Sequence, residues 1–347
     1  MLNLKKVINV EFLKKIINKY QKRTIPIEDL TYLNELIKTS LPLKSCLMLI
    51  TNNLNRKLFE SLLHKLDEGQ LIENIVLDYM PKEISGYMNN LLKRLSFAES
   101  LNLSLSFYTK NKENSKALEK AITYPLILLF ISLTGLYLFD SYGLDSILNL
   151  MKSFNANIET FSIFRIFLKI LIYVFYFAFL IIAVIILIFI NPKRITLFYI
   201  LLTRYFPLSI VKTYFTEDFI SLFVITLNLG YKTKAALEIL KSLNNKPLVA
   251  FLAFHLDDKL IEGASLKEAS EQNYFDDLLV KFINIASYTN NFTGILNNYA
   301  ELSREKIKNK MKTLTTIMQL ASYLVIGIVI VFIYQVLFLP MQAITTL

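Results

Sequence analysis

Long apolar stretches interrupt the polar pattern of the chain at three places. Residues 122–139, 170–190 and 314–339 contain no charged side chain. A helix rises about 1.5 Å per residue, so about 20 apolar residues cross the roughly 30 Å of hydrocarbon in a bilayer. The pattern therefore predicts three transmembrane helices, at 122–139, 164–190 and 314–340. Buried helices of a large soluble core are the alternative interpretation.

Between these stretches, apolar residues recur at helical spacing. In the second intervening segment they follow steps of three and four, as Leu278, Leu279, Phe282, Ile283, Ala286, Ile295, Leu296 and Tyr299. Such spacing gives a helix one apolar face. Alternating runs are scarce and Asn-Gly and Asp-Gly pairs are absent, so strands are not predicted. We expect residues 1–121 (block one) and 191–313 (block two) to be helical bundles, each long enough for its own core.

The two blocks share an order of features that predicts an internal repeat. A turn and helix at Ser40–Leu47 correspond to those at Gly230–Leu237. A turn at Gly69 corresponds to one at Gly263, where glycine can take the positive φ that ends a helix. Each block then continues through another turn into a basic helix and a predicted span. One helical unit used twice explains this order, and chance similarity between two helical blocks is the alternative.

Charge predicts the orientation of the spans. The 347 residues include 38 Lys and Arg against 28 Asp and Glu, and only 19% of them are charged, against about 25% in soluble domains. Block one holds 19 basic and 13 acidic residues, block two holds 16 and 12, and segment 140–163 holds one and three. The positive-inside rule places both blocks in the cytoplasm, and segment 140–163 and tail 341–347 outside. Arg165 and Lys169 are exceptions at the outer end of the second span, where long side chains can reach the headgroups.

The predicted fold class is an all-α membrane protein of the cell membrane. It has three transmembrane helices and two related cytoplasmic helical-bundle domains, with 140–163 as a short external loop. Residues 2–20 form a basic amphipathic stretch, which fits the first helix of a bundle, a helix on the membrane surface or a helix that docks on a partner. The basic residues lie mostly beside the spans, so topology and anionic lipid explain them better than nucleic acid does.

Residues suited to catalysis or metal binding are few. One cysteine, two histidines and eight glycines leave little material for a thiolate metal site or for glycine-rich nucleotide loops. Neither a P-loop nor a Gly-x-Ser-x-Gly motif is present. We predict no catalytic, cofactor-binding or metal-binding residues, a core position for Cys46, and surface or partly buried positions for His64 and His255.

Two pairs of neighbouring acids interrupt block two. Asp257-Asp258 and Asp276-Asp277 are adjacent in sequence, so the two members of a pair do not share a helix face. We expect solvated helix ends at both pairs, with a weak cation site or a docking contact as the alternative.

The order of parts resembles the inner-membrane platform proteins of type II secretion and type IV pilus machines, the GspF/PilC family. Within that family the chain is most similar to the competence-pseudopilus members of Gram-positive bacteria. The resemblance covers nearly the whole chain. The matched positions are Pro42 in a small-Leu-Pro-Leu turn, Gly263 and more loosely Gly69 in a Gly-x-Ser-Leu pattern, Tyr124 and Pro125 at the entry to the first span, and Pro340 at the end of the last.

The chain also departs from the family pattern. The Gly-Glu-x-x-Gly-x-Leu turn of the family keeps Glu99 in block one, with Asn102 where Gly is usual. In block two it keeps Gly294 and Leu296, with Asn291 where Glu is usual. These departures put in doubt any role for that pair of glutamates.

The resemblance implies a non-enzymatic platform. Such a platform couples a separate cytoplasmic ATPase to the extraction of pilin-like subunits from the bilayer and their polymerisation, here for DNA uptake. It implies a homo-oligomer that contacts the ATPase, the pilin-like subunits and lipid, without direct nucleic-acid binding. A membrane scaffold or regulatory protein outside pilus assembly, or an enzyme at the membrane interface, remains as an alternative.

Overall fold

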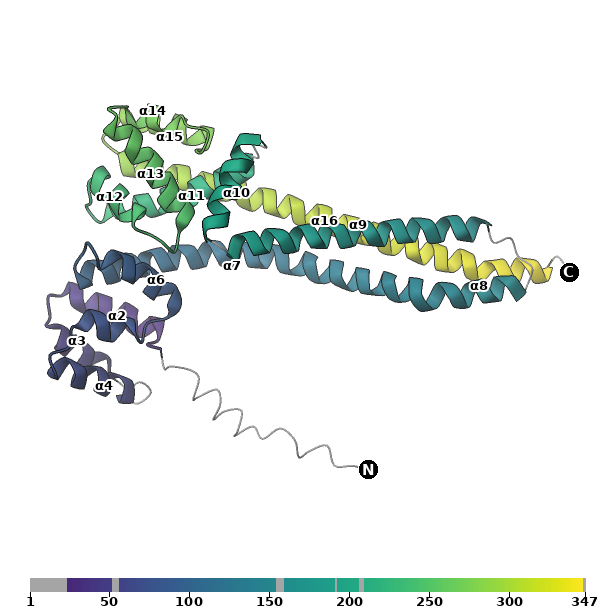
Figure 1. Ribbon diagram of the computed structural model, residues 1–347, viewed down its shortest axis with the longest axis horizontal. Coiled ribbons are helices and arrows are strands. Elements are labelled where there is room, and N and C mark those ends of the chain that lie inside the picture. Colours follow the sequence, from purple (N-terminus) through teal and green to yellow (C-terminus); the bar gives the residue numbers. More distant parts are fainter. Residues whose placement is uncertain (1–23, 52–55, 154–158, 191, 206–208, 346–347) are drawn as a thin grey trace, which may run out of the picture. The chain divides into compact units, whose positions relative to one another are not determined.

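The computed structural model describes residues 24–51, 56–153, 159–190, 192–205 and 209–345. Every regular element within these ranges is a helix (Figure 1), which confirms the all-α prediction for the described part of the chain. Chain contacts define two compact units. The first comprises residues 1–112, 218–272 and 280–297, and the second comprises 113–217, 273–279 and 298–347.

Block one is built from short helices around one apolar core. They are α2 (Ile27–Lys38), α3 (Leu43–Ile50), α4 (Arg56–Asp67), α5 (Ile72–Leu77), α6 (Lys82–Leu91) and the start of α7 (Phe97–Leu138). Their apolar faces meet in a cluster in which Leu33, Leu62 and Leu101 are at most 1% exposed. Cys46 is fully buried in this cluster, as predicted, and burial raises the pKa of its thiol.

Block two repeats this order of helices. They are α10 (Pro192–Tyr205), α11 (Ser209–Asn228), α12 (Thr233–Lys241), α13 (Pro247–Ile261), α14 (Leu266–Ser270), α15 (Asp277–Ser287) and the start of α16 (Phe292–Thr345). Helices α11 to α16 follow one another as α2 to α7 do. The turns agree as well, because Ser40 and Gly230 have φ of 63° and 91°, and Gly69 and Gly263 have φ of 79° and 89°. The backbone thus supports the internal repeat.

The region of the first predicted span is one long helix. Helix α7 continues through residues 122–138 and is followed at once by the π-helical turn η2 (Phe139–Gly143) and α8 (Leu144–Ser153). Residues 140–153 and 159–163 of the segment predicted as an external loop are helical, and the external position of the segment stays a prediction. Arg165 forms an ion pair with Asp145 of α8, whose Nη2 and Oδ1 atoms lie 3.1 Å apart, and the side chain of Leu144 is buried.

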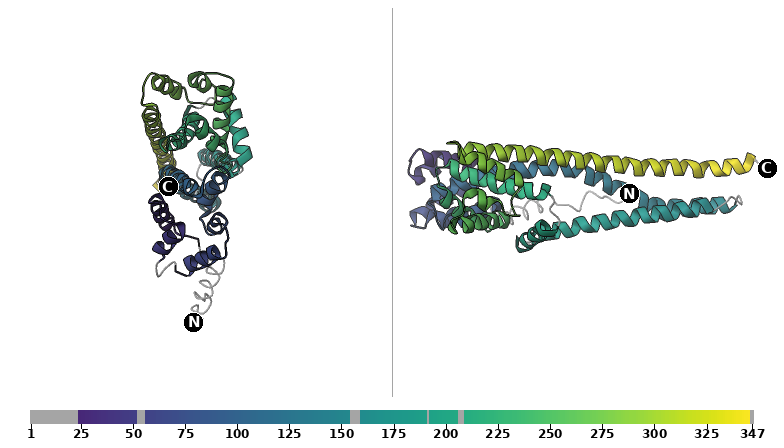
Figure 2. Two further views of the ribbon diagram at one scale, coloured as in Figure 1. Left: turned by 90° about the vertical axis from the view of Figure 1, so that its left-hand side faces the viewer. Right: turned by 90° about the horizontal axis from the view of Figure 1, so that it is seen from above.

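The second and third predicted spans also lie in long helices. Helix α9 (Glu159–Ile190) ends at the last residue of the second predicted span. Helix α16 is uninterrupted (Figure 2) and runs past Pro340 to Thr345, so this proline lies inside the helix, and its place at the end of the third span stays a prediction. Tertiary context can override the helix-breaking tendency of proline, which removes one backbone hydrogen bond.

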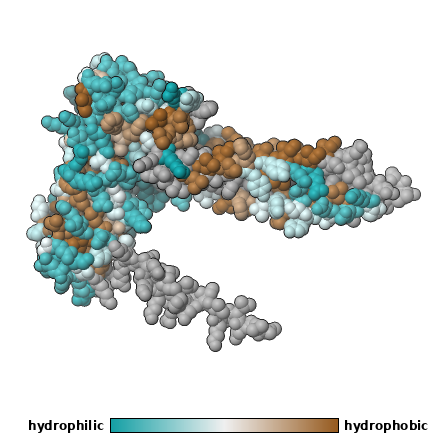
Figure 3. Space-filling model, in the orientation of Figure 1, coloured by the Kyte–Doolittle hydropathy of each residue, from teal (hydrophilic) through white to brown (hydrophobic). Residues whose placement is uncertain are grey.

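One helix in the described part of the chain is long and apolar enough to cross a membrane. It is the segment Phe292–Ile328 of α16, where 6% of the most apolar window is buried. Exposed large apolar side chains also follow α7 and α9, among them Ile127, Phe130, Ile166, Tyr173 and Phe177. Apolar surface gathers along these long helices in Figure 3, whereas α12 to α15 show a mainly polar surface. The first and second spans, and the domain boundaries, remain predictions.

Candidate functional site

Three of the glycines that the sequence singled out, Gly69, Gly230 and Gly263, each lie at the C-terminal end of a helix. At Gly69, Gly230 and Gly263, the amide of the next residue donates to the carbonyl five residues earlier, with N···O distances of 3.0–3.3 Å. This is the Schellman arrangement, which needs a residue with positive φ. A Cβ at any of the three would meet no atom within 4 Å, so backbone conformation alone favours glycine there.

Capping side chains begin the helices that follow. Ser265 and Glu268 form a capping box at α14, in which the Glu268 carboxylate accepts from the Ser265 amide at 2.7 Å. Ser96 and Glu99 make the same contacts at α7, where the Ser96 amide donates to Glu99 at 3.1 Å. These hydrogen bonds lower the pKa of both carboxyl groups. Glu99 therefore has a structural role as a cap.

Helix α16 begins with a different cap. The amide of Gly294 donates to Asn291 Oδ1 at 3.1 Å. A Cβ on Gly294 would lie 2.4 Å from that oxygen, so any larger residue would displace the cap. The departure at Asn291 thus fits the family pattern kept at Gly294, since asparagine caps the helix and glycine leaves room for it.

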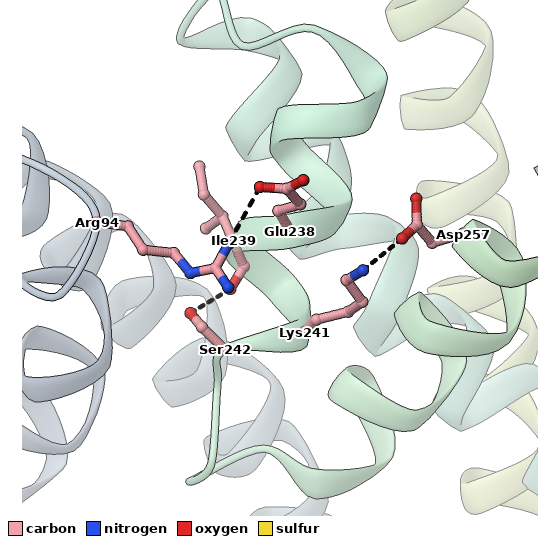
Figure 4. Close-up of polar contacts among 6 residues, drawn as sticks. All are labelled: Arg94, Glu238, Ile239, Lys241, Ser242 and Asp257. Atoms are coloured by element: carbon pink, nitrogen blue, oxygen red, sulfur yellow. Dashed lines mark hydrogen bonds and ion pairs between the residues drawn. The ribbon is translucent and has the colours of Figure 1, made fainter. Parts of the chain in front are cut away.

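A polar contact joins the two blocks within the first compact unit. Arg94, at the end of α6, lies 3.1 Å from Glu238 of α12 (Figure 4). The side-chain Nδ2 of Asn244 donates to Asn90 Oδ1 at 3.1 Å. The Arg94–Glu238 pair is about half exposed, and such pairs contribute about 0–1 kcal/mol.

Two further residues of block two, Lys246 and Tyr231, extend this contact. Lys246 Nζ donates to Asn111 at 2.8 Å and to Asp218 at 2.9 Å. Tyr231 is hydrogen bonded to Glu99, and its burial and that carboxylate raise the pKa of the phenol to about 12. The cap of α7 therefore also takes part in the contact between the blocks.

A buried acidic cluster lies in the second compact unit. Asp276 is 6% exposed, and it accepts hydrogen bonds from Thr213 at 2.9 Å and from Tyr299 at 3.4 Å. Its own amide donates to Thr216 at 3.1 Å. Neighbouring Glu217 is 1% exposed and pairs with Arg304 at 2.8 Å. The cluster ties α11, the start of α15 and α16 together by hydrogen bonds and an ion pair within the chain.

The prediction that both acid pairs are solvated helix ends was wrong for one member of each pair. Asp257 is 5% exposed and forms an ion pair with Lys241 (Figure 4), while Asp276 is the buried residue just before α15. Asp258 and Asp277 are exposed. A buried acid beside an exposed one follows from helical geometry, because neighbours point to different faces.

The histidines are positioned as predicted. His64 is 75% exposed and lies 3.1 Å from Glu68. His255 is partly buried against the Phe251 ring, and burial lowers the pKa of its imidazole. Among the residues that the structure describes, no group of three or more His, Cys, Asp or Glu side chains could hold a metal ion.

The remaining motif positions lie at helix starts or inside long helices. Pro42 precedes α3, where a missing amide costs nothing. Tyr124 and Pro125 lie inside α7, and Tyr124 is hydrogen bonded to Tyr323 of α16. The basic stretch at residues 2–20 lies outside the described residues.

Sequence reasoning missed the buried role of Asp276 within block two and the residues that join the two blocks. Asp276 carried a usable signal, because an aspartate just before an apolar periodic run is a typical helix cap. Arg94, Glu238 and Asn244 carried none, since surface and contact residues of these types look alike in sequence.

The comparison with protein families gives a match to block two and the helix after it. Residues 219–340 match the family model described as Type II secretion system (T2SS), protein F. The match runs from within α11 to the end of the third predicted span, and it supports the resemblance drawn from the sequence motifs. None of the curated proteins compared with the chain matches it.

Proposed function

We propose that this chain is the multi-pass membrane platform of a type IV pilus-like or type II secretion-like assembly machine. The platform couples a separate cytoplasmic ATPase to the extraction and polymerisation of pilin-like subunits, in the service of DNA uptake. Both helical blocks lie in the cytoplasm, and three helices cross the membrane.

The family match over residues 219–340 is the observation that carries the proposal. It includes helices α12 to α15 of block two and the apolar helix Phe292–Ile328. The repeated turns at Gly69 and Gly263 extend the likeness to block one, which the match does not reach.

The proposed mechanism is mechanical. A partner that hydrolyses nucleotide can shift the platform between states only if its own states bind the platform differently. The blocks suit such a role because each is built from short helices with buried apolar side chains. The half-exposed Arg94–Glu238 pair between them can be broken at small cost. Exposed aromatic and aliphatic side chains on α9 suit transient contact with the apolar helices of pilin-like subunits.

The test is photo-cross-linking in cells that assemble the fibre. A photoreactive amino acid replaces Tyr32 in block one, Phe254 in block two or Tyr173 in α9, all of which are exposed. We expect the ATPase to be captured from Tyr32 or Phe254 and a pilin-like subunit from Tyr173. The matched control is Leu62, which is fully buried and should capture neither partner.

Capture of neither partner from any exposed position, while fibres assemble, would refute the platform proposal. Capture of unrelated membrane proteins from both blocks would favour a scaffold or regulatory protein instead. Deletion of the gene should abolish DNA uptake; loss of fibres with normal DNA uptake would refute only the assigned role.

A further inference from the structure

The internal repeat allows the contact surfaces of the two blocks to be compared position by position. A shift of 190 residues takes Leu43, which begins α3, to Thr233, which begins α12, and a shift of 195 takes α6 to α15. Core positions match under these shifts: Cys46, Leu47 and Ile50 match Ala236, Leu237 and Leu240, and Ile84, Met88 and Leu91 match Leu279, Ile283 and Ala286, all of them buried.

Positions in the contact between the blocks break this agreement. Ile239 of α12 follows the contact residue Glu238 and is 3% exposed, whereas its counterpart in α3, Leu49, is 65% exposed. Asn90 of α6 is 6% exposed, whereas its counterpart in α15, Ile285, is 52% exposed. The contact therefore uses the α6 side of block one and the α12 side of block two.

Two complementary faces are left uncovered. The α3 face of block one presents Met48 and Leu49, which are 53% and 65% exposed. The α15 face of block two presents Ile285 and Tyr288, which are 52% and 83% exposed. Each face is the repeat counterpart of one that takes part in the contact between the blocks within the chain.

We propose that a second copy of this chain docks the α15 face of its block two on the α3 face of block one. The contact between copies repeats the contact of α6 with α12 inside one copy. Thr289 and Met48 then take the places of Arg94 and Glu238. This inference rests on the repeat and is independent of the proposed function.

The contact between the blocks within one chain is polar, whereas the two exposed faces are apolar. The covalent link between the blocks accounts for this difference. Within one chain the covalent link keeps the two blocks at high local concentration, so polar pairs suffice. Two separate chains lack that link, and apolar burial is the main favourable term in association. Because the two faces differ, the contact is head-to-tail and builds a closed ring or an open row of copies.

The experiment cross-links two differently tagged full-length copies in native membranes. One carries Met48→Cys and the other Thr289→Cys, both with Cys46→Ala, which removes the single native cysteine. A short bismaleimide is used because counterparts of an Arg–Glu pair lie farther apart than the Cα distance of about 4.4–6.8 Å that a disulfide allows. We expect a product that carries both tags, and little product from either variant alone.

Three controls make the outcome decisive. Arg94→Cys with Glu238→Cys in one copy should cross-link within that copy. Glu68→Cys with Glu262→Cys, at matching exposed positions outside the contact, should give no product between copies. Leu49→Lys should lower the mixed product at least fivefold, while Leu49→Met should not.

Each remaining outcome overturns the proposal. One is the absence of a mixed product when the internal pair does cross-link. Another is cross-linking of Met48→Cys to itself between copies, which would show a symmetric contact. The third is a cross-link within one copy between Met48→Cys and a cysteine introduced as Asn3→Cys, which would show that the N-terminal segment covers the α3 face.

Discussion

The neighbouring residues Asp276 and Asp277 have different roles because only Asp276 is buried. Asp276 is 6% exposed and receives hydrogen bonds from Thr213 and Tyr299, whereas Asp277 is exposed in the first turn of α15. Burial makes the first a structural acid, because removing it would leave two buried hydroxyl groups without their acceptor. The second interacts mainly with water and the helix dipole.

We predict that Asp276→Ala lowers the free energy of unfolding by about 2–4 kcal/mol, through lost hydrogen bonds and a lost helix cap. Asp277→Ala, the matched control, should lower it by less than about 1 kcal/mol. Thermal unfolding of the detergent-solubilised protein measures both. Equal effects of the two substitutions would show that Asp276 does not hold α11, α15 and α16 together.

At the scale of an element, the helix boundaries are set by local chemistry. The turn at Gly263 ends α13 with positive φ, and Ser265 starts α14 two residues later. A stop followed at once by a start gives a sharp change of direction between two helices. The capping box adds a charge-assisted hydrogen bond at the end of the helix where the dipole favours an anion.

The capping box makes the start of α14 sensitive to acid. Hydrogen bonds from Ser265 lower the pKa of Glu268 below its ordinary value. A lowered carboxyl pKa contributes stability above the unfolded value, and this contribution is lost as pH falls through the folded value. Amide protection at residues 265–269 should therefore persist at neutral pH and fall several-fold below pH of about 4.

Hydrogen exchange, corrected for its intrinsic pH dependence, measures this loss. Glu268→Gln is the control, because it keeps a hydrogen-bond acceptor and cannot titrate in this range. Its protection should change little between the two conditions. A wild-type chain that behaved like the Gln variant would contradict the role of the carboxylate.

The helices and turns could be predicted from the sequence better than the contacts between them. Apolar periodicity indicated helices, and glycine chemistry indicated the turns at Gly69 and Gly263, because both signals are local. Helix ends inside the long helices were not predictable: Pro340 lies within α16, and segment 140–163 is largely helical. The contact of Arg94 with Glu238 depends on how two distant segments pack, which local patterns do not encode.

In the chain as a whole, each copy of the internal repeat is continuous with a long apolar helix. Each block ends in a long helix, α7 or α16, that starts with a side-chain cap and runs on into a predicted span. Such a helix connects a folded block to the bilayer without a flexible joint. The positive-inside rule predicts that the basic residues before the first and third predicted spans place both blocks on the same side of the membrane.

Topology is the prediction that tests this arrangement directly. In a Cys46→Ala background, Ser146→Cys on α8 and Lys234→Cys on α12 both place a thiol at an exposed position. Because α8 lies in the predicted external segment, a membrane-impermeant maleimide should label Ser146→Cys in intact cells. It should label Lys234→Cys only after the membrane is permeabilised. The pairing of Arg165 with Asp145 favours this outcome, since it neutralises a positive charge that would otherwise oppose an external location. The reverse labelling pattern would mean that the blocks lie outside, and protection of both thiols in intact cells would mean that 140–163 is not external.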